Sequence, residues 1–246
     1  MKSRVHIGTS GWSYKHWTGL LYPPALKPPQ WLSYYSQLFD ISEINTSFYH
    51  LPKPVTVKGW LDKVPGHFKF CPKINRYLTH IKRLIDPEEP LERFFEVFEP
   101  MKERMGPVLV QLPPKLPFQY ERASHLYSLF NSVYKDYSFV MEVRHDSWLG
   151  TDSLTLMAEF NIGLVISQSG NVFPYSEKVT AKNVYIRFHG PGHLYASQYS
   201  DEMLMNYASK IKGWVNEGHQ IWAFFNNDVN GYAIGDARKL MRMAEK

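Results

Sequence analysis

Eight short apolar segments recur along the chain at intervals of roughly 20 to 40 residues, and no other feature of the sequence constrains the fold as strongly. Each segment is rich in Val, Ile or Phe, as is typical of short strands buried on both faces of a sheet. Because most stretches between them have helical periodicity, strands and helices alternate, which produces a parallel sheet through right-handed crossovers. The predicted strands span residues 5–8, 41–48, 68–73, 108–112, 139–144, 163–167, 184–188 and 220–226.

Helical periodicity is clearest in three of the connecting stretches. Apolar residues recur at spacings of three and four between residues 57 and 64 and between residues 91 and 105, which predicts helices that face the core. A third helix begins after Ser200, a good N-cap residue, and ends at Gly218. The connection 168–182 has no apolar stripe, so its helix is expected to be short or missing.

These elements predict an α/β fold, a (β/α)8 TIM barrel that is slightly irregular and forms one domain over residues 1–246. The alternative is a doubly wound open sheet, since it uses the same alternation of strands and helices. Open sheets of that kind usually carry a glycine-rich phosphate loop, and neither G-x-G-x-x-G nor G-x-x-x-x-G-K-[ST] occurs here. The barrel is therefore preferred, and either fold places functional residues at the carboxyl ends of the strands.

The composition narrows the class of protein further. No apolar run approaches the roughly 18 residues that a membrane-spanning helix needs, and residues 1–12 lack the apolar core of a secretory signal. The single cysteine, Cys71, cannot form an internal disulfide and is expected to be a small buried residue. We therefore expect a cytoplasmic protein without a membrane partner. The net charge of +5 favours anionic ligands, although scattered basic residues do not locate their site.

Alternate residues of a barrel strand point into the barrel, and four of the predicted strands carry polar or charged residues at these positions. Barrel interiors are normally filled with branched apolar side chains, and an unpaired buried charge costs several kcal/mol. The inward side chains must therefore be ion-paired, hydrated or bound to a ligand. A purely structural ion-pair network is the alternative, more so for the deeper Glu43 and Lys69 than for Lys73, Arg144 and Arg187 near the mouth. The inward positions are Glu43, Asn45 and Ser47; Lys69, Cys71 and Lys73; Glu142 and Arg144; and Tyr185, Arg187 and His189.

Three inward cations close to the strand ends predict a site for a phosphate or carboxylate group. Guanidinium groups bind such oxygens bidentately, and a lysine supplies a point charge. Side-chain amides near the same strand ends are expected to orient the hydroxyl groups of a ligand. The cations are Lys73, Arg144 and Arg187, and the amides are Asn45, Gln111, Asn226 and Asn227.

Acid–base chemistry is the reaction type that these residues favour. Glu142 is the predicted general acid or base, with His145 and His189 as alternatives because imidazole titrates near neutral pH. Residues 8–11 are one residue short of the G-x-S-x-G nucleophile elbow, which disfavours serine hydrolysis. The inward faces also lack the Asp and His cluster of a two-metal hydrolase, so neither a metal nor another cofactor is expected.

Aromatic residues are frequent in the loops that follow the predicted strands. They are suited to stacking on sugar rings or nucleic-acid bases, and the alternative is that they only cap the barrel. Three of them, Trp12, Tyr49 and Trp148, are assigned to substrate binding. The loop aromatics are Trp12, Tyr14, Trp17, Tyr49, Trp148 and Tyr195.

Seven groups of residues, spread over nearly the whole chain, match the pattern of one known family. They are Gly8-Thr9-Ser10-Gly11-Trp12 with Tyr14 and Trp17; Glu43-Ile44-Asn45-Thr46-Ser47-Phe48-Tyr49; Lys73 with Thr79-His80; Gln111-Leu112-Pro113-Pro114; Glu142-Val143-Arg144-His145 with Ser147-Trp148; Arg187-Phe188-His189-Gly190; and Phe225-Asn226-Asn227 with Gly231, Ala233 and Ala237. On these residues the chain resembles the YecE-like family of TIM barrels, a domain of unknown function. The resemblance implies the barrel fold and names no reaction, and it adds His80 to the predicted substrate-binding residues.

The leading functional hypothesis is an enzyme, of the hydrolase or the isomerase and lyase type, that acts on a small phosphorylated or carboxylated, sugar-like substrate. The first alternative is a barrel that binds or processes nucleic acid, because cations and aromatic residues both occur at the predicted mouth. A catalytically inactive scaffold is the second alternative. No pattern in the sequence bears on the oligomeric state.

Overall fold

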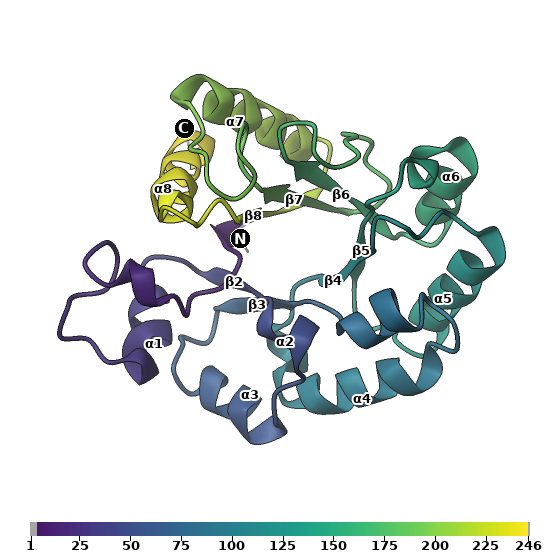
Figure 1. Ribbon diagram of the computed structural model, residues 1–246, viewed down its shortest axis with the longest axis horizontal. Coiled ribbons are helices and arrows are strands. Elements are labelled where there is room, and N and C mark those ends of the chain that lie inside the picture. The colour runs from purple at the N-terminus through teal and green to yellow at the C-terminus, as the bar shows by residue number, and fades with distance from the viewer. Residues whose placement is uncertain (1–3, 246) are drawn as a thin grey trace.

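The structure, a computed structural model, describes residues 4–245. Within that range, eight parallel strands surround a common centre and the main helices lie outside them (Figure 1). All eight predicted strands are present, and their bounds differ from the predicted ones by a few residues at most. The strands are β1 (Val5–Thr9), β2 (Ile41–Ile44), β3 (Lys69–Pro72), β4 (Val108–Gln111), β5 (Phe139–Glu142), β6 (Gly163–Gln168), β7 (Asn183–Phe188) and β8 (Gln220–Phe225).

The strands follow the order β3-β2-β1-β8-β7-β6-β5-β4, so the first and last strands of the chain are neighbours. The two edge strands, β3 and β4, nearly close the barrel. Isolated parallel bridges join Phe70 to Met105 and Lys73 to Leu109, and the Ile74 amide donates to the Leu109 carbonyl at 2.8 Å. The fold is therefore the predicted (β/α)8 TIM barrel, with one weakly paired seam.

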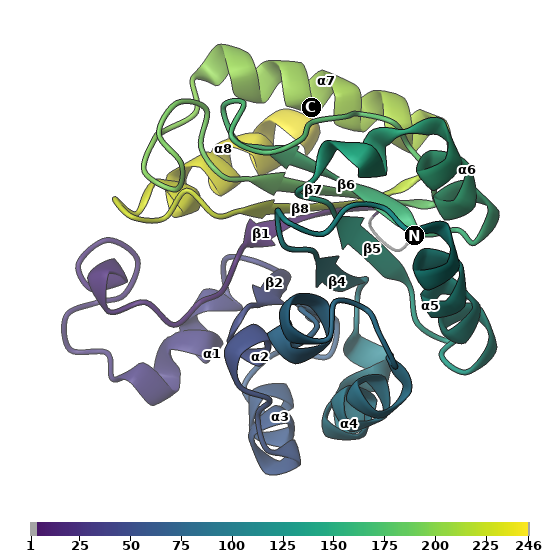
Figure 2. The same ribbon diagram turned by 45° about the vertical axis from the view of Figure 1, so that its right-hand side comes forward.

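The longer helices form a layer around the strands, seen from two directions in Figures 1 and 2. No helix of the described chain separates β6 from β7, as the missing apolar stripe predicted. The α-helices are α1 (Trp31–Tyr35), α2 (Thr46–Tyr49), α3 (Pro54–Leu61), α4 (Glu88–Phe98), α5 (Tyr120–Ser132), α6 (Thr151–Glu159), α7 (Asp201–Asn216) and α8 (Tyr232–Glu245). Short 3-10 segments span Lys15–Trp17, Pro28–Gln30, Glu99–Arg104 and Asp146–Leu149, and a π-helical turn spans Tyr77–Ile81.

Two predicted elements were wrong in extent. The strand predicted over 41–48 ends at Ile44, because Asn45 adopts helical dihedral angles and Ser47 donates its hydroxyl to the carbonyls of Ile44 and Lys73 at 3.0 and 2.7 Å. The helix predicted over 91–105 changes to a 3-10 helix after residue 98, where Pro100 lacks the amide hydrogen that an α-helix needs.

The barrel interior is divided along its axis into an apolar floor and a charged upper layer. The floor is tightly packed: a Cβ atom on Gly106 would lie 2.6 Å from Cys71 Sγ and from the Trp222 ring. Cys71 is fully buried there, as predicted. Charged inward residues begin at the next level, towards the carboxyl ends of the strands. The floor consists of Ile41, Cys71, Leu109, Val140, Val165, Tyr185, Trp222 and Phe224.

Candidate functional site

A buried ion-pair network fills the upper layer of the barrel and is centred on Arg187 of β7. Its Nη2 and Nη1 atoms contact Glu43 Oε1 of β2 at 2.7 Å and Glu142 Oε2 of β5 at 2.6 Å, and its Nε donates to Glu43 Oε2 at 3.0 Å. Both carboxylates are fully buried. Tyr185 also donates to Glu43 Oε2 at 2.8 Å. Arg187 thus links two strands on different sides of the barrel, and Glu43 is ion-paired within the network.

Glu142 is saturated with hydrogen-bond donors. Besides Arg187, it accepts from Arg144 Nη2 at 2.7 Å, Ser167 Oγ at 2.9 Å and His189 Nε2 at 2.8 Å. Burial by itself would raise the pKa of this carboxyl, but Arg144 and Arg187 hold the pKa well below its usual range. Glu142 is therefore an ionised anchor whose oxygens are occupied by protein donors.

His189 is held in its neutral form. Its Nε2 donates to Glu142, and its Nδ1 accepts from Asn226 Nδ2 at 3.2 Å, so each ring nitrogen has a partner. Burial lowers the pKa of His189 to about 4, despite the opposing effect of the Glu142 carboxylate. The ring is fully buried. His189 thus connects Glu142 to Asn226 through hydrogen bonds, and Asn226 lines the mouth pocket.

Arg144 is the incompletely satisfied cation of the network. One nitrogen, Nη2, donates to Glu142, while its Nε and Nη1 atoms are buried without a hydrogen-bond partner. The guanidinium lies 3.2 Å from the centre of the Phe173 ring, a cation–π contact. Burial lowers the pKa of Arg144, with Glu142 opposing the effect. Two buried nitrogens whose hydrogens have no acceptor are costly inside a protein, and ligand oxygens would satisfy them.

Lys73 follows β3 directly and carries a charge that no carboxylate balances at close range. The side chain is 7% exposed, Nζ donates to Gln111 Oε1 at 2.6 Å, and it lies 3.9 Å from the centre of the Phe48 ring. No ion pair within 4.0 Å involves this lysine in the described part of the chain. Burial and the neighbouring Arg187 lower its pKa to about 7.

A pocket of ≈ 550 Å³ opens at the carboxyl ends of the strands, and we call it the mouth pocket. It brings together five polar predicted residues, Asn45, Lys73, Gln111, Arg187 and Asn226, with the exposed Tyr49. The Asn45 amide donates from Nδ2 to the Ser10 carbonyl at 3.3 Å and leaves Oδ1 buried without a partner. The complete lining is Tyr14, His16, Asn45, Phe48, Tyr49, Lys73, Gln111, Arg187, Tyr195, Asn226, Asp228 and Val229.

The contact between two lining residues, His16 and Asp228, was not predicted from the sequence. His16 Nε2 lies 2.8 Å from Asp228 Oδ2 and 2.9 Å from the Asp228 carbonyl, so Nε2 carries the hydrogen. Asp228 Oδ1 also accepts from Trp17 Nε1 at 2.6 Å, and burial raises the pKa of this carboxyl. β1 pairs with β8, so the loops after these two strands lie next to each other. Because a barrel brings its first and last strands together, this contact between the two loops could have been expected from the predicted fold.

Eight predicted site residues do not line the mouth pocket. Three of them, Glu142, Arg144 and His189, belong to the buried network, His80 lies beside the pocket, and the fold uses the other four elsewhere. His145 caps the 3-10 helix Asp146–Leu149, accepting from the Ser147 amide at 3.2 Å. Trp148 is buried and donates to the Leu116 carbonyl at 2.9 Å. The side chains of the other two also make internal contacts. Trp12 packs edge-on against Trp60 and Phe70, and Asn227 donates to Asp236 Oδ2 of α8 at 2.8 Å.

His80 lies beside the mouth pocket without lining it. Its Nδ1 is 2.8 Å from Thr79 Oγ1, and its ring packs edge-on against Phe48, the same ring that Lys73 contacts. Burial and the positive charge of Lys73 lower the pKa of His80 to about 4. His80 is therefore neutral near pH 7, and it supports the wall of the pocket on the Lys73 side.

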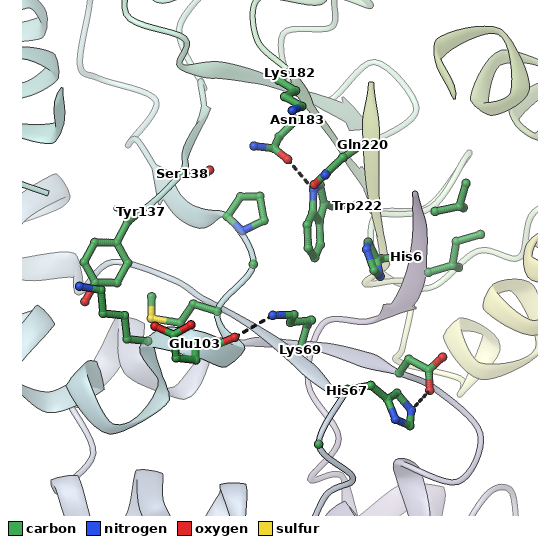
Figure 3. Close-up of a pocket in the computed structure, with 18 of the residues that line it drawn as sticks. His6, His67, Lys69, Glu103, Tyr137, Ser138, Lys182, Asn183, Gln220 and Trp222 are labelled. Atoms are coloured by element: carbon green, nitrogen blue, oxygen red, sulfur yellow. Dashed lines mark hydrogen bonds and ion pairs between the residues drawn. The ribbon is translucent and has the colours of Figure 1, made fainter. Parts of the chain in front are cut away.

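A larger cavity, of ≈ 1010 Å³, lies at the opposite end of the barrel (Figure 3). Lys69, which the strand pattern placed inward, contributes to this end, where its Nζ donates to the Glu103 carbonyl at 2.8 Å. His6 and Trp222 stack there with ring centres 4.3 Å apart. The amino-terminal end of a TIM barrel usually serves stability, so size alone does not make this cavity the functional site.

The fold and the mouth together define a class: a TIM barrel whose carboxyl-end pocket overlies a buried ion-pair network. The chain belongs to the family described as "Protein of unknown function DUF72", whose model matches residues 6–246. This membership confirms the YecE-like resemblance. The UPF0759 protein YecE of Escherichia coli K12 is 25% identical over 234 residues, which cover 85% of this chain and 82% of that protein.

Two further relatives agree with this assignment. The UPF0759 protein YunF of Bacillus subtilis is 22% identical over 271 residues, covering 98% of this chain and 95% of that protein. The crystal structure of a DUF72 family protein from Thermotoga maritima superimposes with a TM-score of 0.86 at 29% identity, covering 98% of this chain and 99% of that one. The Thermotoga maritima protein thus has the same fold over almost the whole length of this chain.

Residues 4–245 contain neither a membrane-spanning helix nor a cluster of metal-binding side chains. No helix in this range is long and apolar enough to cross a membrane. No group of three or more His, Cys, Asp or Glu side chains in the same range has a geometry that could hold a metal ion. The two glutamates in the barrel interior, Glu43 and Glu142, are bound by arginines.

Proposed function

We propose that the mouth pocket binds a small ligand with a phosphate or carboxylate group, and that the protein is an enzyme acting on it by acid–base chemistry. The observation that carries this proposal is the charge of the buried network. Within this network two carboxylates, Glu43 and Glu142, are balanced by Arg144 and Arg187, so a protonated Lys73 adds one positive charge. The carboxyl of Asp228, which lines the same pocket, is bound by His16 and Trp17 instead. A buried uncompensated charge is costly, and a ligand anion would neutralise it.

The hydrogen-bonding capacity of Arg144 supports the same proposal. Its Nε and Nη1 atoms point to different edges of the guanidinium and have no protein acceptor, so each is a buried donor that an oxygen of a bound anion would satisfy. Amide groups of Asn45, Gln111 and Asn226 line the pocket and would bind hydroxyl groups, and the exposed ring of Tyr49 offers a stacking face. A small phosphorylated or carboxylated, sugar-like substrate fits this set of contacts.

We propose that the acid–base groups are His16 and Lys73, which face the pocket, in place of the residues expected from the sequence. Glu142 and His189 are buried with their polar atoms occupied, so they position other groups instead of exchanging protons with a ligand. His16, held by Asp228 through Nε2, keeps Nδ1 for proton exchange, and Lys73 titrates in the same pocket. A reaction of the hydrolase or the isomerase and lyase type is consistent with such a pair.

The first prediction concerns anion binding and its dependence on pH. Sulfate is the probe, because its charge does not change between pH 6 and pH 8.5. We expect sulfate to bind the wild type about tenfold more weakly at pH 8.5, since Lys73, with a pKa of about 7, is then mostly neutral. Isothermal titration calorimetry at constant ionic strength measures both affinities.

Two substitutions make this test specific. Lys73→Met should weaken sulfate binding at pH 6 and remove its pH dependence, whereas Lys63→Met removes an equal charge from an exposed loop and should change neither. Arg144→Met should weaken binding at both pH values. Sulfate affinity that is the same at both pH values in the wild type, or unchanged in Lys73→Met, contradicts the proposal.

Nucleic-acid binding is the other outcome of this test. A single-stranded oligonucleotide would contact cations along a groove, and its affinity would fall steeply with salt concentration. The extra cation here is instead buried in a pocket of ≈ 550 Å³, which suits a small ligand better. Tight oligonucleotide binding with a steep salt dependence, together with no sulfate binding, would replace the enzyme proposal.

A further inference from the structure

We propose that Lys73 is a nucleophile that forms a Schiff base with a substrate carbonyl group. The substrate class of the mouth pocket would then be an aldehyde or ketone that also bears a phosphate or carboxylate. The anionic part of this inference rests on the proposed function, while the carbonyl part rests on the surroundings of the Lys73 amine alone.

The position of the Lys73 amine meets the geometric requirements of such a nucleophile. The residue follows β3 at the carboxyl end of the barrel and lines the mouth pocket, where a ligand can reach it. Its Nζ is held between the Phe48 ring, 3.9 Å away, and Gln111 Oε1, 2.6 Å away. Gln111 is a neutral acceptor, so the contact orients the amine without the strong preference for the ammonium form that a carboxylate would impose.

The contrast with Lys69 shows that this placement is particular to one lysine. The two residues are four positions apart, so alternation along the strand assigns both side chains to the inner face of the barrel. Lys69 lies at the amino-terminal end, where its Nζ donates to the Glu103 carbonyl and the cavity of Figure 3 opens. Lys73 lies at the other end, where it lines the mouth pocket together with Arg187.

The electrostatic surroundings supply the neutral amine that carbonyl attack needs. Burial and the positive charge of Arg187 lower the pKa of Lys73 to about 7, so a large fraction is unprotonated at neutral pH. An exposed lysine, with a pKa near 10.4, is neutral in roughly one molecule in a few thousand at pH 7. Desolvation next to another cation is an established way to activate a lysine for Schiff-base chemistry.

The proposed step balances without an oxidant or reductant. The nitrogen lone pair of neutral Lys73 attacks the carbonyl carbon, and a proton moves from nitrogen to oxygen to give a carbinolamine. The hydroxyl group then takes up a second proton and leaves as water, and the nitrogen lone pair forms the C=N bond. The resulting iminium ion is positively charged, so the charge of protonated Lys73 is retained beside the bound anion. His16 and Asp228 line the same pocket and are suited to move these protons.

The test traps the imine with a reductant added from outside. Purified protein is incubated at pH 7 with sodium cyanoborohydride and either glyoxylate, an aldehyde with a carboxylate, or acetaldehyde, an uncharged one. Peptide mass spectrometry then measures the rate of modification of each lysine. We expect Lys73 to react about tenfold faster than exposed lysines such as Lys63, and faster with glyoxylate than with acetaldehyde.

Variants control for folding and for burial. Lys73→Arg keeps the charge but cannot form an imine, so the rapid modification should disappear while sulfate still binds. Lys69→Arg, at the other end of the same strand, should leave the modification of Lys73 unchanged. The measurement on the wild type does not depend on any variant. If both aldehydes modify Lys73 no faster than the exposed lysines, the inference is overturned.

The outcomes also separate this inference from the proposed function. Sulfate binding together with an unreactive Lys73 overturns the Schiff base and keeps the anion site. Rapid modification of Lys73 by acetaldehyde, without sulfate binding and without a preference for glyoxylate, supports the nucleophile and overturns the anionic substrate. Rapid modification that sulfate suppresses supports both.

Discussion

At the scale of single residues, His189 should determine much of the stability of the protein in mild acid. The pKa of this ring is about 4 in the folded protein and near 6.5 in the unfolded chain, so the unfolded chain binds the proton first as the pH falls. The contribution to stability is therefore complete above pH 6.5 and is lost as the pH falls towards 4. Its full size is about 3 kcal/mol.

His189→Gln tests this prediction because glutamine cannot titrate. Urea unfolding at pH 7 and pH 4.5 should show that the variant loses about 2 kcal/mol less than the wild type over this interval. The matched control is His80→Gln: its pKa is also about 4, but the ring is only half-buried, so solvent screening should make its effect smaller. An equal pH dependence in wild type and His189→Gln would contradict the prediction.

At the scale of elements, the helix α7 begins and ends as its sequence indicated. Ser200 Oγ accepts from the Met203 amide at 3.2 Å, and Gly218 has a φ of +94°, which favours glycine. We predict that Ser200→Ala lowers the free energy of unfolding by about 1 kcal/mol and that Ser200→Asp, which retains an acceptor, is close to the wild type. Urea denaturation measures both, and equal losses in the two variants would rule out the cap as the cause.

At the scale of the whole molecule, the barrel should open first at its seam. β7 and β8 pair continuously from Asn183↔Gln220 to Phe188↔Phe225, whereas isolated bridges join β3 to β4. Hydrogen exchange followed by mass spectrometry should therefore show faster exchange of the seam amides of Gly106 and Ile74 than of the amides in β8. Protection at the seam equal to that of β8 would indicate that the barrel opens only globally.

The structure of the pocket links this seam to the candidate site. Lys73 forms one of the seam bridges, to Leu109, and its amine reaches Gln111 at the end of β4. The contact between Lys73 and Gln111 therefore crosses the weakest strand pair of the barrel. A ligand held by the mouth pocket would bind both edge strands, so the sulfate that tests the proposed function should also slow exchange at the seam.

The sequence by itself determined the positions of the strands and the inward direction of their polar residues. Both are local properties, because apolar runs identify buried strands and alternation along a strand assigns each side chain to a face. Glu43, Lys73, Glu142 and Arg187 were found in this way. The extent of an element was wrong where the local backbone changed, as at Asn45, where β2 ends and α2 begins, and at Pro100, where a 3-10 helix follows α4.

Only the tertiary structure decided which polar groups are satisfied and which remain for a ligand. The sequence predicted Glu142 as a general acid or base. In the fold its carboxylate accepts hydrogen bonds from four side chains, those of Arg144, Ser167, Arg187 and His189. His16 and Asp228 become partners 212 positions apart because β1 closes on β8. Lys73 is distinguished from Lys69 by the end of the barrel it occupies. Such distances depend on how the whole sheet closes, and no local pattern in the chain encodes that closure.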